Sequence, residues 1–298
     1  MKISMKERIF QLVNGLIFTL FAFVCIYPFY YLFINSLSDP VQSAKGLVIL
    51  YPKGFTLENY TQILKLDGIA SAFFISASRA VIGTIIQLFF SSMFAFVLTK
   101  NQYRINKFLY RAMVITMYMS AGIIPWFVVM KSLGLANNYL LYILPGAVAP
   151  FSVILIKTYM ENISPFLEES ASIDGAGVMT IFLKIILPVC QPVLMAVAVF
   201  GAVGQWNSWQ DNFFLVKSPH LQTLQMMLMN VLKESESLTT AVQNNADAIK
   251  DIAAQSNKMT PFAVKTTITM VATIPIICVY PFLQKYFVSG IMIGAVKG

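Results

Sequence analysis

Six long stretches without a charged side chain constrain the fold of this chain more than any other feature. Each stretch has at least 19 residues, and about 20 apolar residues cross the hydrocarbon core of a bilayer as a helix. Because unpaired backbone groups are costly in lipid, we expect these stretches to be helical. We predict an all-α membrane protein with six transmembrane helices in a single domain, residues 1–298. The expected spans are residues 10–36, 76–99, 112–130, 138–157, 185–210 and 265–284.

Composition leaves little material for a separate soluble domain. Hydrophobic residues make up 57% of the chain and charged residues 11%, against about 25% charged residues in soluble domains. Basic residues precede the first apolar run, as in a secretory signal peptide. That run is too long for a signal, and no small-residue cleavage pattern follows it, so we expect an uncleaved span. Cys25, Cys190 and Cys278 lie in apolar stretches without CxxC spacing, and we expect them to be buried apolar side chains.

The distribution of Lys and Arg predicts the orientation in the membrane. With the N-terminus in the cytoplasm, the short inner segments have a higher density of basic residues than the much longer outer loops. Six spans then place the C-terminus inside as well. The net charge of +8 reflects this topology. Nucleic acid is not an expected partner, because no basic residues cluster on one face.

A polar stretch between two apolar blocks, residues 165–188, is predicted to form a helix–turn–helix. Ser164 is a candidate N-cap for a helix that begins at Pro165, and Gly175 is suited to end that helix in a left-handed turn. In the N-inside topology this stretch belongs to a cytoplasmic loop, residues 158–184. A short, charged and well-capped helical hairpin in a membrane protein indicates a docking element.

The most polar part of the chain is the predicted external loop, residues 211–264. Within it, residues 233–258 contain small and polar side chains at near-helical spacing, with a thin apolar stripe at Ile249, Ile252 and Ala253. A solvated helix and a contact with an external partner explain this pattern equally well.

The sequence Glu-Ser-Ala-Ser-Ile-Asp-Gly-Ala, from Glu169 to Ala176, resembles the EAA loop of ATP-binding-cassette (ABC) importer permeases. It departs from the family pattern at Ser170, which replaces an alanine and keeps the side chain small. Three other segments also resemble this family and occur in the expected order along the chain. They are Pro52 with Thr56–Tyr60, the Trp206–Asn207 pair and the tail, residues 284–298. The chain is thereby identified as a member of the carbohydrate-uptake branch, similar to MalG-type subunits and to LplC- and YtcP-type permeases.

The resemblance implies a type I ABC importer permease fold with a cytoplasmic EAA coupling-helix loop, in a bacterial cytoplasmic (inner) membrane. The implied partners are membrane lipid, a second homologous permease in a heterodimer, two cytoplasmic ATPase subunits, an external solute-binding protein and an oligosaccharide. Transport would proceed by ATP-driven alternating access. The chain has no P-loop of the GxxxxGK[ST] type, so ATP and Mg²⁺ would bind to the partner ATPase, and this chain would carry no cofactor, metal or catalytic residue.

Other functions remain open at this point. A permease of the same family for a non-sugar solute and a non-transport membrane scaffold are both alternatives. An integral-membrane enzyme would need convergent His, Asp, Glu or Cys groups near the spans, and the sequence has one His and almost no intramembrane acid.

Three groups of candidate functional residues follow. By resemblance, the acidic side chains of the EAA loop would pair with basic groups of the ATPase, and its small residues would permit close approach. Aromatic and amide side chains at the end of the fifth span are candidates for the substrate pathway, although Trp also anchors helices at the membrane interface. The coupling residues are Glu168, Glu169, Ala171, Asp174, Gly175 and Ala176; the cytoplasmic tail contacts are Lys297 and Gly298; and the pathway residues are Trp206, Asn207, Trp209 and Gln210.

Two further residues are expected to have no functional role. Arg79 lies at the edge of a span, where a long side chain can extend its charged end to water. His220 stands alone in a loop beside Pro219, without the neighbours that a metal site needs. We therefore expect both side chains to be solvated.

Overall fold

The computed structural model describes residues 4–100, 104–244 and 260–295, and within them every regular element is a helix. The chain separates into two compact units. The first contains residues 1–67 and 228–274, and the second contains residues 68–227 and 275–298. Two helices, α13 (Leu224–Asn244) and α15 (Pro261–Ala295), contribute residues to both units.

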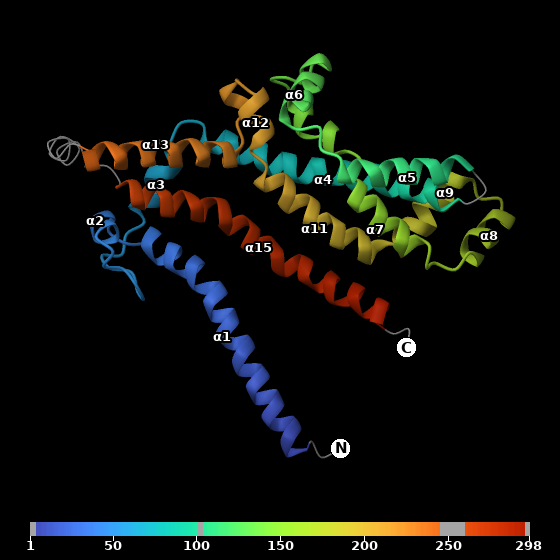
Figure 1. The fold of residues 1–298 in the computed structure, drawn as a ribbon, viewed down its shortest axis with the longest axis horizontal. Helices are drawn as coiled ribbons and strands as arrows, with labels where there is room; N and C mark the ends of the chain where they lie inside the picture. The colour runs from blue at the N-terminus through green and yellow to red at the C-terminus, as the bar shows by residue number, and fades with distance from the viewer. Residues whose placement is uncertain (1–3, 101–103, 245–259, 296–298) are drawn as a thin grey trace. The chain divides into compact units, whose positions relative to one another are not determined.

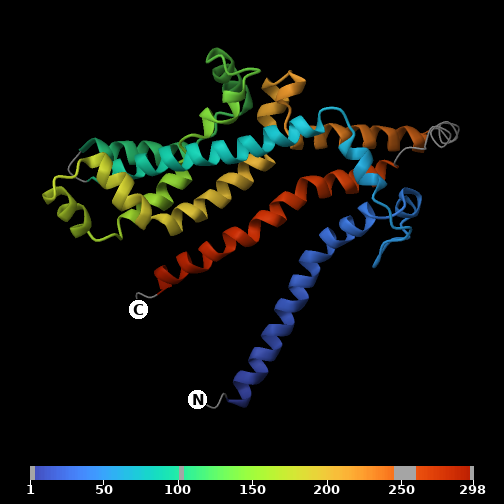
Figure 2. The same cartoon turned by 180° about the vertical axis from the view of Figure 1, so that it is seen from behind.

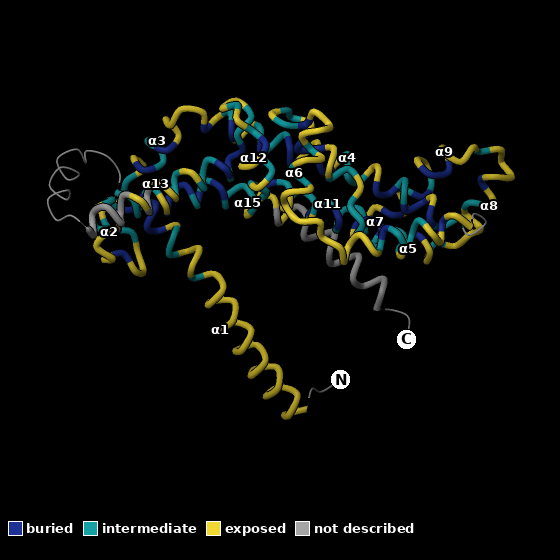
Figure 3. The backbone as a smooth tube through the Cα atoms, turned by 45° about the horizontal axis from the view of Figure 1, so that its top comes forward, coloured by how far each residue is buried: buried dark blue, intermediate teal, exposed yellow. Residues whose placement is uncertain are grey.

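Helix α1 (Met5–Ser36) opens the first unit and is apolar on all sides. Its first turn is closed by Glu7, whose carboxylate accepts the backbone N–H of Ser4 at 2.8 Å. The buried residues of α1 are confined to its C-terminal end, and most of the helix is exposed (Figure 3). A helix with no polar face and so little protein cover is suited to lipid or to another membrane helix.

The prediction that all three cysteines are buried is wrong for two of them. Cys190 is buried, whereas Cys25 and Cys278 are exposed. Both exposed residues lie on long apolar helices, α1 and α15. Hydrophobicity therefore predicts an apolar environment for them, but it does not distinguish protein interior from lipid.

A buried polar cluster fixes the C-terminal end of α1 against the short helices α2 (Pro40–Ala44) and α3 (Glu58–Leu64). The Asn59 amide donates to the carbonyl oxygens of Ser36 and Ser38, at 2.9 Å each. The hydroxyls of Tyr60 and Ser36 are 2.7 Å apart, and burial raises the pKa of Tyr60. These contacts satisfy carbonyl groups that a helix end leaves unpaired. The Thr56–Tyr60 motif thus has a structural role in this segment.

Helix α4 (Ile69–Thr99) is the central helix of the second unit. Helices α5 (Arg104–Tyr118), α7 (Pro150–Met160) and α11 (Gln191–Asn207) lie alongside it (Figures 1 and 2). Small side chains on α4 allow these neighbours to approach closely. The buried small residues are Ala72, Ser76, Ala80, Gly83, Thr84, Ser91, Ser92 and Ala95.

Among the described residues, three helices are long and apolar enough to cross a membrane, or up to five if each of two bent helix pairs is one span. The predicted spans at residues 10–36, 76–99 and 265–284 lie within α1, α4 and α15. The third, fourth and fifth predicted spans are interrupted or bent, as described next.

The predicted span over residues 112–130 is not one continuous helix in the structure. Helix α5 ends at Tyr118, and α6 (Ile123–Ser132) begins only after Gly122, which has a φ of +81°. A side chain disfavours that backbone conformation, so glycine permits a sharp break inside an otherwise apolar stretch.

The fourth and fifth spans are bent. The fourth consists of two short 3₁₀ turns, η1 (Tyr139–Tyr142) and η2 (Leu144–Gly146), followed by α7 at 43°. The fifth bends by 80° between Val178–Val189 and α11. Proline lies in the first turn of both α7 and α11, where its missing N–H costs no helical hydrogen bond.

Replacing Asn59 by Leu tests the polar cluster at the end of α1. The variant leaves two carbonyl groups without donors, so we expect the free energy of unfolding to fall by about 1–3 kcal/mol. The measurement is the thermal unfolding midpoint of the purified protein in detergent. Thr61→Ala, on the exposed side of α3, is the matched control and should leave the midpoint unchanged. An Asn59→Leu protein as stable as the wild type would contradict this role.

Candidate functional site

The stretch predicted as a helix–turn–helix contains α8 (Phe166–Ile173) and α9 (Val178–Ile181). Helix α8 begins one residue later than expected, because Pro165 and not Ser164 is its N-cap. Pro165 already has helical dihedral angles, with φ −58° and ψ −26°, which its ring favours. Ser164 contributes its carbonyl oxygen, which accepts the Leu167 N–H at 3.3 Å.

The turn after α8 has the hydrogen bonds of a Schellman motif. The N–H of Ala176 donates to the carbonyl oxygen of Ala171 at 2.9 Å, and the N–H of Gly175 donates to that of Ser172 at 3.1 Å. Gly175 has a φ of +81°, the left-handed conformation that this motif requires. The positive φ expected at this glycine is therefore confirmed. Asp174 is the C-cap of α8, so it lies in the turn and does not cap α9.

The inner face of α8 is attached to the core of the second unit. Ala171 is 8% exposed and belongs to a cluster that contains Phe96 of α4 and Phe182 of η3 (Phe182–Ile186), the π-helical turn after α9. The two phenyl ring centroids are 5.3 Å apart. Glu168 forms an ion pair with Lys100 at the end of α4. These contacts fix the hairpin to the end of the central helix.

The outer face of the hairpin is apolar and acidic. Phe166 is 74% exposed, Ile173 86% and Val178 70%, and Glu169 is also exposed. Large exposed apolar side chains beside polar ones are typical of a contact surface. Ala171 does not belong to this face, contrary to the expectation that its small side chain is available to a partner.

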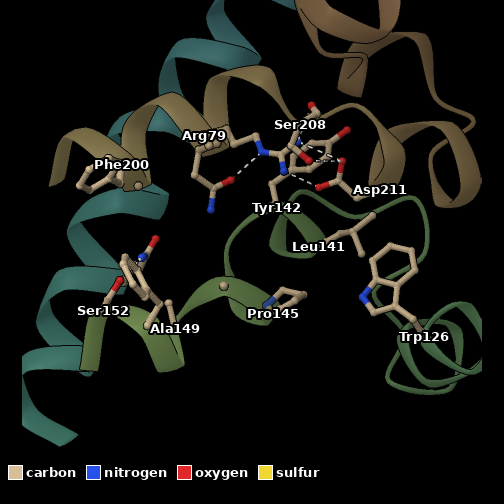
Figure 4. Close-up of a pocket in the computed structure, with 16 residues that line it drawn as sticks. Arg79, Trp126, Leu141, Tyr142, Pro145, Ala149, Ser152, Phe200, Ser208 and Asp211 are labelled. Carbon is tan, nitrogen blue, oxygen red and sulfur yellow. Dashed lines mark hydrogen bonds and ion pairs between the residues drawn. The ribbon is translucent and has the colours of Figure 1, made fainter. Parts of the chain in front are cut away.

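A cavity of about 460 Å³ lies in the second unit among α4, α7, α11 and the turns η1 and η2. Its volume falls within the range of about 300–1,000 Å³ that is usual for small-molecule sites. Figure 4 shows Arg79, Tyr142 and Asp211 gathered on one side, and Ser152 and Phe200 on another. The neutral polar and aromatic lining residues are Gln87, Gln205, Ser152, Ser208, Tyr142, Trp126, Phe151 and Phe200.

A buried ion pair forms one side of this cavity. Arg79 is 4% exposed, and its guanidinium pairs with both carboxylate oxygens of Asp211. Its Nε donates to Gln205 Oε1 at 2.8 Å, and its Nη1 donates to the Ser208 carbonyl oxygen at 3.3 Å. The guanidinium carbon also lies 4.6 Å from the ring centroid of Tyr142.

The prediction that Arg79 is solvated is therefore wrong. Its partners Gln205 and Asp211 are 126 and 132 positions further along the chain, so the sequence near Arg79 gives no sign of them. A usable signal was the pair of amide side chains, Gln87 and Gln205, inside charge-free stretches. Polar groups at such positions are costly unless they have a structural or functional role.

The predicted pathway residues lie near this cavity but do not line it. Trp206 is 8% exposed and packs edge-to-face against Phe73, with ring centroids 5.8 Å apart. Asn207 accepts a hydrogen bond from Gln225 at 3.0 Å, and Trp209 packs against Phe213.

Gln210, the fourth predicted pathway residue, lines a second cavity of about 520 Å³. The two cavities share Trp126, Ser208 and Asp211 in their walls. The second cavity therefore adjoins the first at the buried ion pair.

Three further predicted features concern His220, the C-terminal tail and the external loop. His220 is exposed, as expected. Lys297, Gly298 and the apolar stripe at residues 249–253 lie outside the described residues. Within the part of the chain that the structure describes, no group of three or more His, Cys, Asp or Glu side chains could hold a metal ion.

Comparison with known proteins decides the family. No protein-family model matches the chain. Protein LplC of Bacillus subtilis (strain 168) is 34% identical over 98% of this chain and 96% of its own length. The polygalacturonan/rhamnogalacturonan transport system permease protein YtcP of the same strain is 33% identical over 99% of this chain and 100% of its own. The chain belongs to this family of carbohydrate ABC transporter permeases.

A solved structure agrees with the family assignment. The permease resembles a chain in the crystal structure of a bacterial ABC transporter involved in the import of the acidic polysaccharide alginate, with a TM-score of 0.82 and 29% identity. The match covers 96% of this chain and 99% of that chain. The family predicted from the EAA-like segment is confirmed, and so is the all-helical permease fold.

Removing the cation of the Arg79–Asp211 ion pair tests whether the pair is buried in the permease. Arg79→Met leaves the Asp211 carboxylate without its cation, so we expect the free energy of unfolding to fall by about 3–5 kcal/mol. The double variant Arg79→Met with Asp211→Leu removes both charges and should recover most of that loss, because a buried pair contributes little net stability. Thermal unfolding midpoints of the three proteins provide the comparison. A single variant that unfolds at the wild-type midpoint would contradict the buried pair.

Proposed function

We propose that this permease is one of two transmembrane subunits of a binding-protein-dependent ABC importer for oligosaccharides, driven by ATP through alternating access. The EAA loop, residues 158–184, is the contact to the ATPase. The observation that carries this proposal is the two-sided helix α8. One side is held to the core by Ala171 and Glu168, and the other exposes Phe166 and Ile173. The polysaccharides named for YtcP and for the alginate transporter support a saccharide as cargo.

The contacts of the hairpin suggest how movement of the ATPase reaches the cavity. Phe182, which follows α9, lies 5.3 Å from Phe96 and 6.4 Å from Phe89 between ring centroids, and both phenylalanines are on α4. Gln87 of the cavity wall is only two residues before Phe89. Because packed interiors transmit displacement with little compression, a shift of α8 is expected to move α4 with it. Rigid-body rotation of packed helices is an established route to such switching.

The proposed assembly follows from this role. Six spans, of which the third to fifth are broken or bent, place both termini in the cytoplasm of a bacterium, with the permease in the cytoplasmic membrane. A second homologous permease completes the pathway, and two ATPase subunits bind ATP and Mg²⁺. The external loop, residues 211–264, contacts the solute-binding protein.

Co-purification tests the proposed function directly. An affinity-tagged permease is expected to bring down a second permease and an ATPase from the native membrane. Adding the saccharide-loaded solute-binding protein to the reconstituted complex should raise the rate of ATP hydrolysis. A permease that purifies alone and supports no saccharide uptake would contradict the proposal.

Ile173→Ser and Glu169→Ala test the outer face of α8. Both side chains are exposed, so we expect the thermal unfolding midpoint to stay at the wild-type value. The apparent Kd for the ATPase should rise at least about tenfold, which corresponds to a loss of about 1.4 kcal/mol. The matched control is Glu161→Ala, which removes an acidic side chain that is 45% exposed in the same loop but outside α8. Equal ATPase affinity in all three variants would contradict the coupling role of α8.

Gly175→Val and Gly175→Asn test the turn. A Cβ at this position meets no atom within 4 Å, so any cost comes from the backbone conformation alone. Valine disfavours a φ of +81° by about 1–2 kcal/mol, whereas asparagine tolerates it. We expect ATPase association, measured by co-purification, to fall in Gly175→Val and to be retained in Gly175→Asn. Equal association in the two variants would show that the turn geometry does not matter for docking.

A further inference from the structure

We propose that the cavity among α4, α7 and α11 is a saccharide-binding site that recognises hydroxyl groups and ring faces, and not the negative charge of an acidic sugar. This inference rests on the proposed function, because it assigns the cargo a position within this subunit. It concerns a site other than the predicted pathway residues Trp206, Asn207 and Trp209, none of which lines the cavity.

The charges in the wall cancel each other. Among the described lining residues, Arg79 and Asp211 are the charged ones. The guanidinium donates to Asp211 twice, and also to Gln205 and Ser208, so four of its five N–H donors are in use. The Asp211 carboxylate also accepts a hydrogen bond from the backbone N–H of Asn212 at 2.8 Å. Binding a carboxylate tightly requires a cation with free donors, and this pair offers almost none.

Neutral polar groups keep free hydrogen-bonding capacity. Gln87 Nε2 donates to Ser152 Oγ at 3.0 Å, which leaves Gln87 Oε1 as an acceptor and the Ser152 hydroxyl hydrogen as a donor. Gln205 Oε1 accepts from Arg79, so the orientation of its amide is fixed and its NH₂ group remains as a donor. Acceptors and donors that are both neutral and fixed in position are suited to sugar hydroxyls, which both donate and accept.

Aromatic side chains supply the apolar part of the same wall. Trp126, Phe151 and Phe200 all line the cavity. Apolar and aromatic walls with a few well-placed polar groups are typical of small-molecule sites. A pyranose ring has apolar C–H faces and a polar rim, so it matches such a wall better than an ion or a purely apolar solute does.

Glycine lets the two amide side chains of the wall pack directly against the backbone. A Cβ at Gly201 would lie 3.1 Å from Gln87 Oε1, and one at Gly146 would lie 3.3 Å from Gln205 Nε2. At Gly204, in contrast, a Cβ meets no atom within 4 Å. Because Gly204 also lines the cavity, a side chain there begins at the wall without a clash at its Cβ.

The experiment measures direct binding of two probes to the permease–ATPase complex in lipid nanodiscs. The probes are a galacturonate trimer and its fully methyl-esterified form, which has the same hydroxyl pattern without the charge. The wild-type complex is expected to bind both with affinities within about threefold of each other. Gly204→Leu, which adds a bulky side chain at the cavity wall, and Gln87→Leu, which removes its amide, should weaken both at least about tenfold, or about 1.4 kcal/mol for each tenfold step.

A charge variant gives a signature that a purely structural role would not produce. Asp211→Asn leaves Arg79 with an unpaired charge and free donors. The affinity of this variant for the acidic trimer, divided by its affinity for the ester, should therefore exceed the wild-type ratio at least about tenfold. The control is Gly15→Leu, on exposed α1, where a Cβ also meets no atom within 4 Å; it should bind like wild type. Should Asp211→Asn assemble poorly, Gln87→Leu and Gly204→Leu still decide the site.

Three results would overturn the inference. The first is a wild-type complex that binds the acid at least tenfold more tightly than the ester. The second is that the Gly204→Leu and Gln87→Leu complexes bind both probes like wild type. The third is a wild-type complex that binds neither probe. Saccharide uptake by the reconstituted importer is measured in parallel. Uptake together with any of these results would leave the proposed function intact, whereas loss of uptake with every saccharide would remove both.

Discussion

A broken helix in an apolar protein needs polar partners for the backbone groups that the break sets free. Buried side chains of this permease supply them. Asn59 donates to two carbonyl groups at the end of α1, and Asn106 donates to two at the end of α4. Arg79 reaches the carbonyl oxygen of Ser208 after α11, and a serine hydroxyl of α4 accepts the N–H of Ala149 before α7. Ser208 and Ala149 both line the cavity, so the cavity lies beside one helix bend and one helix end that are held by groups from the central helix.

The contacts between the hairpin and α4 are of two kinds. Apolar packing connects Ala171 and Phe182 with α4, and the Glu168–Lys100 ion pair adds an electrostatic contact at the same end. The ion pair is partly exposed, with side chains 24% and 31% accessible, and such pairs contribute little stability. The apolar cluster is therefore the main attachment of the hairpin to α4, and the ion pair is better suited to fixing the orientation of α8. This explains why Ala171 is the buried residue of α8.

Much of this architecture follows from the sequence, but the bends and the site do not. Long charge-free stretches predict α1, α4 and α15 well, since hydrophobicity and length are sufficient there. The break at Gly122 escaped because a glycine inside an apolar run has several possible roles, and only its φ of +81° identifies a break. Gly175 was predictable because an acidic helix ends just before it. Arg79 was misjudged because burial of a charge depends on a partner, here Asp211, that is distant in sequence.

A transport site has to release what it binds, and this requirement bears on the pairing of Arg79 with Asp211. Conduction needs binding that is favourable enough for entry and weak enough for exit. An unpaired buried guanidinium would attract an acidic saccharide strongly, because electrostatic attraction is large where water is excluded. Paired with Asp211, the same group belongs to an ion pair without net charge, while Gln87, Gln205 and Ser152 still offer hydrogen bonds of ordinary strength. In the proposed site, a neutral wall would let an acidic and a neutral sugar pass at similar rates, and would leave charge selection to the proposed solute-binding protein.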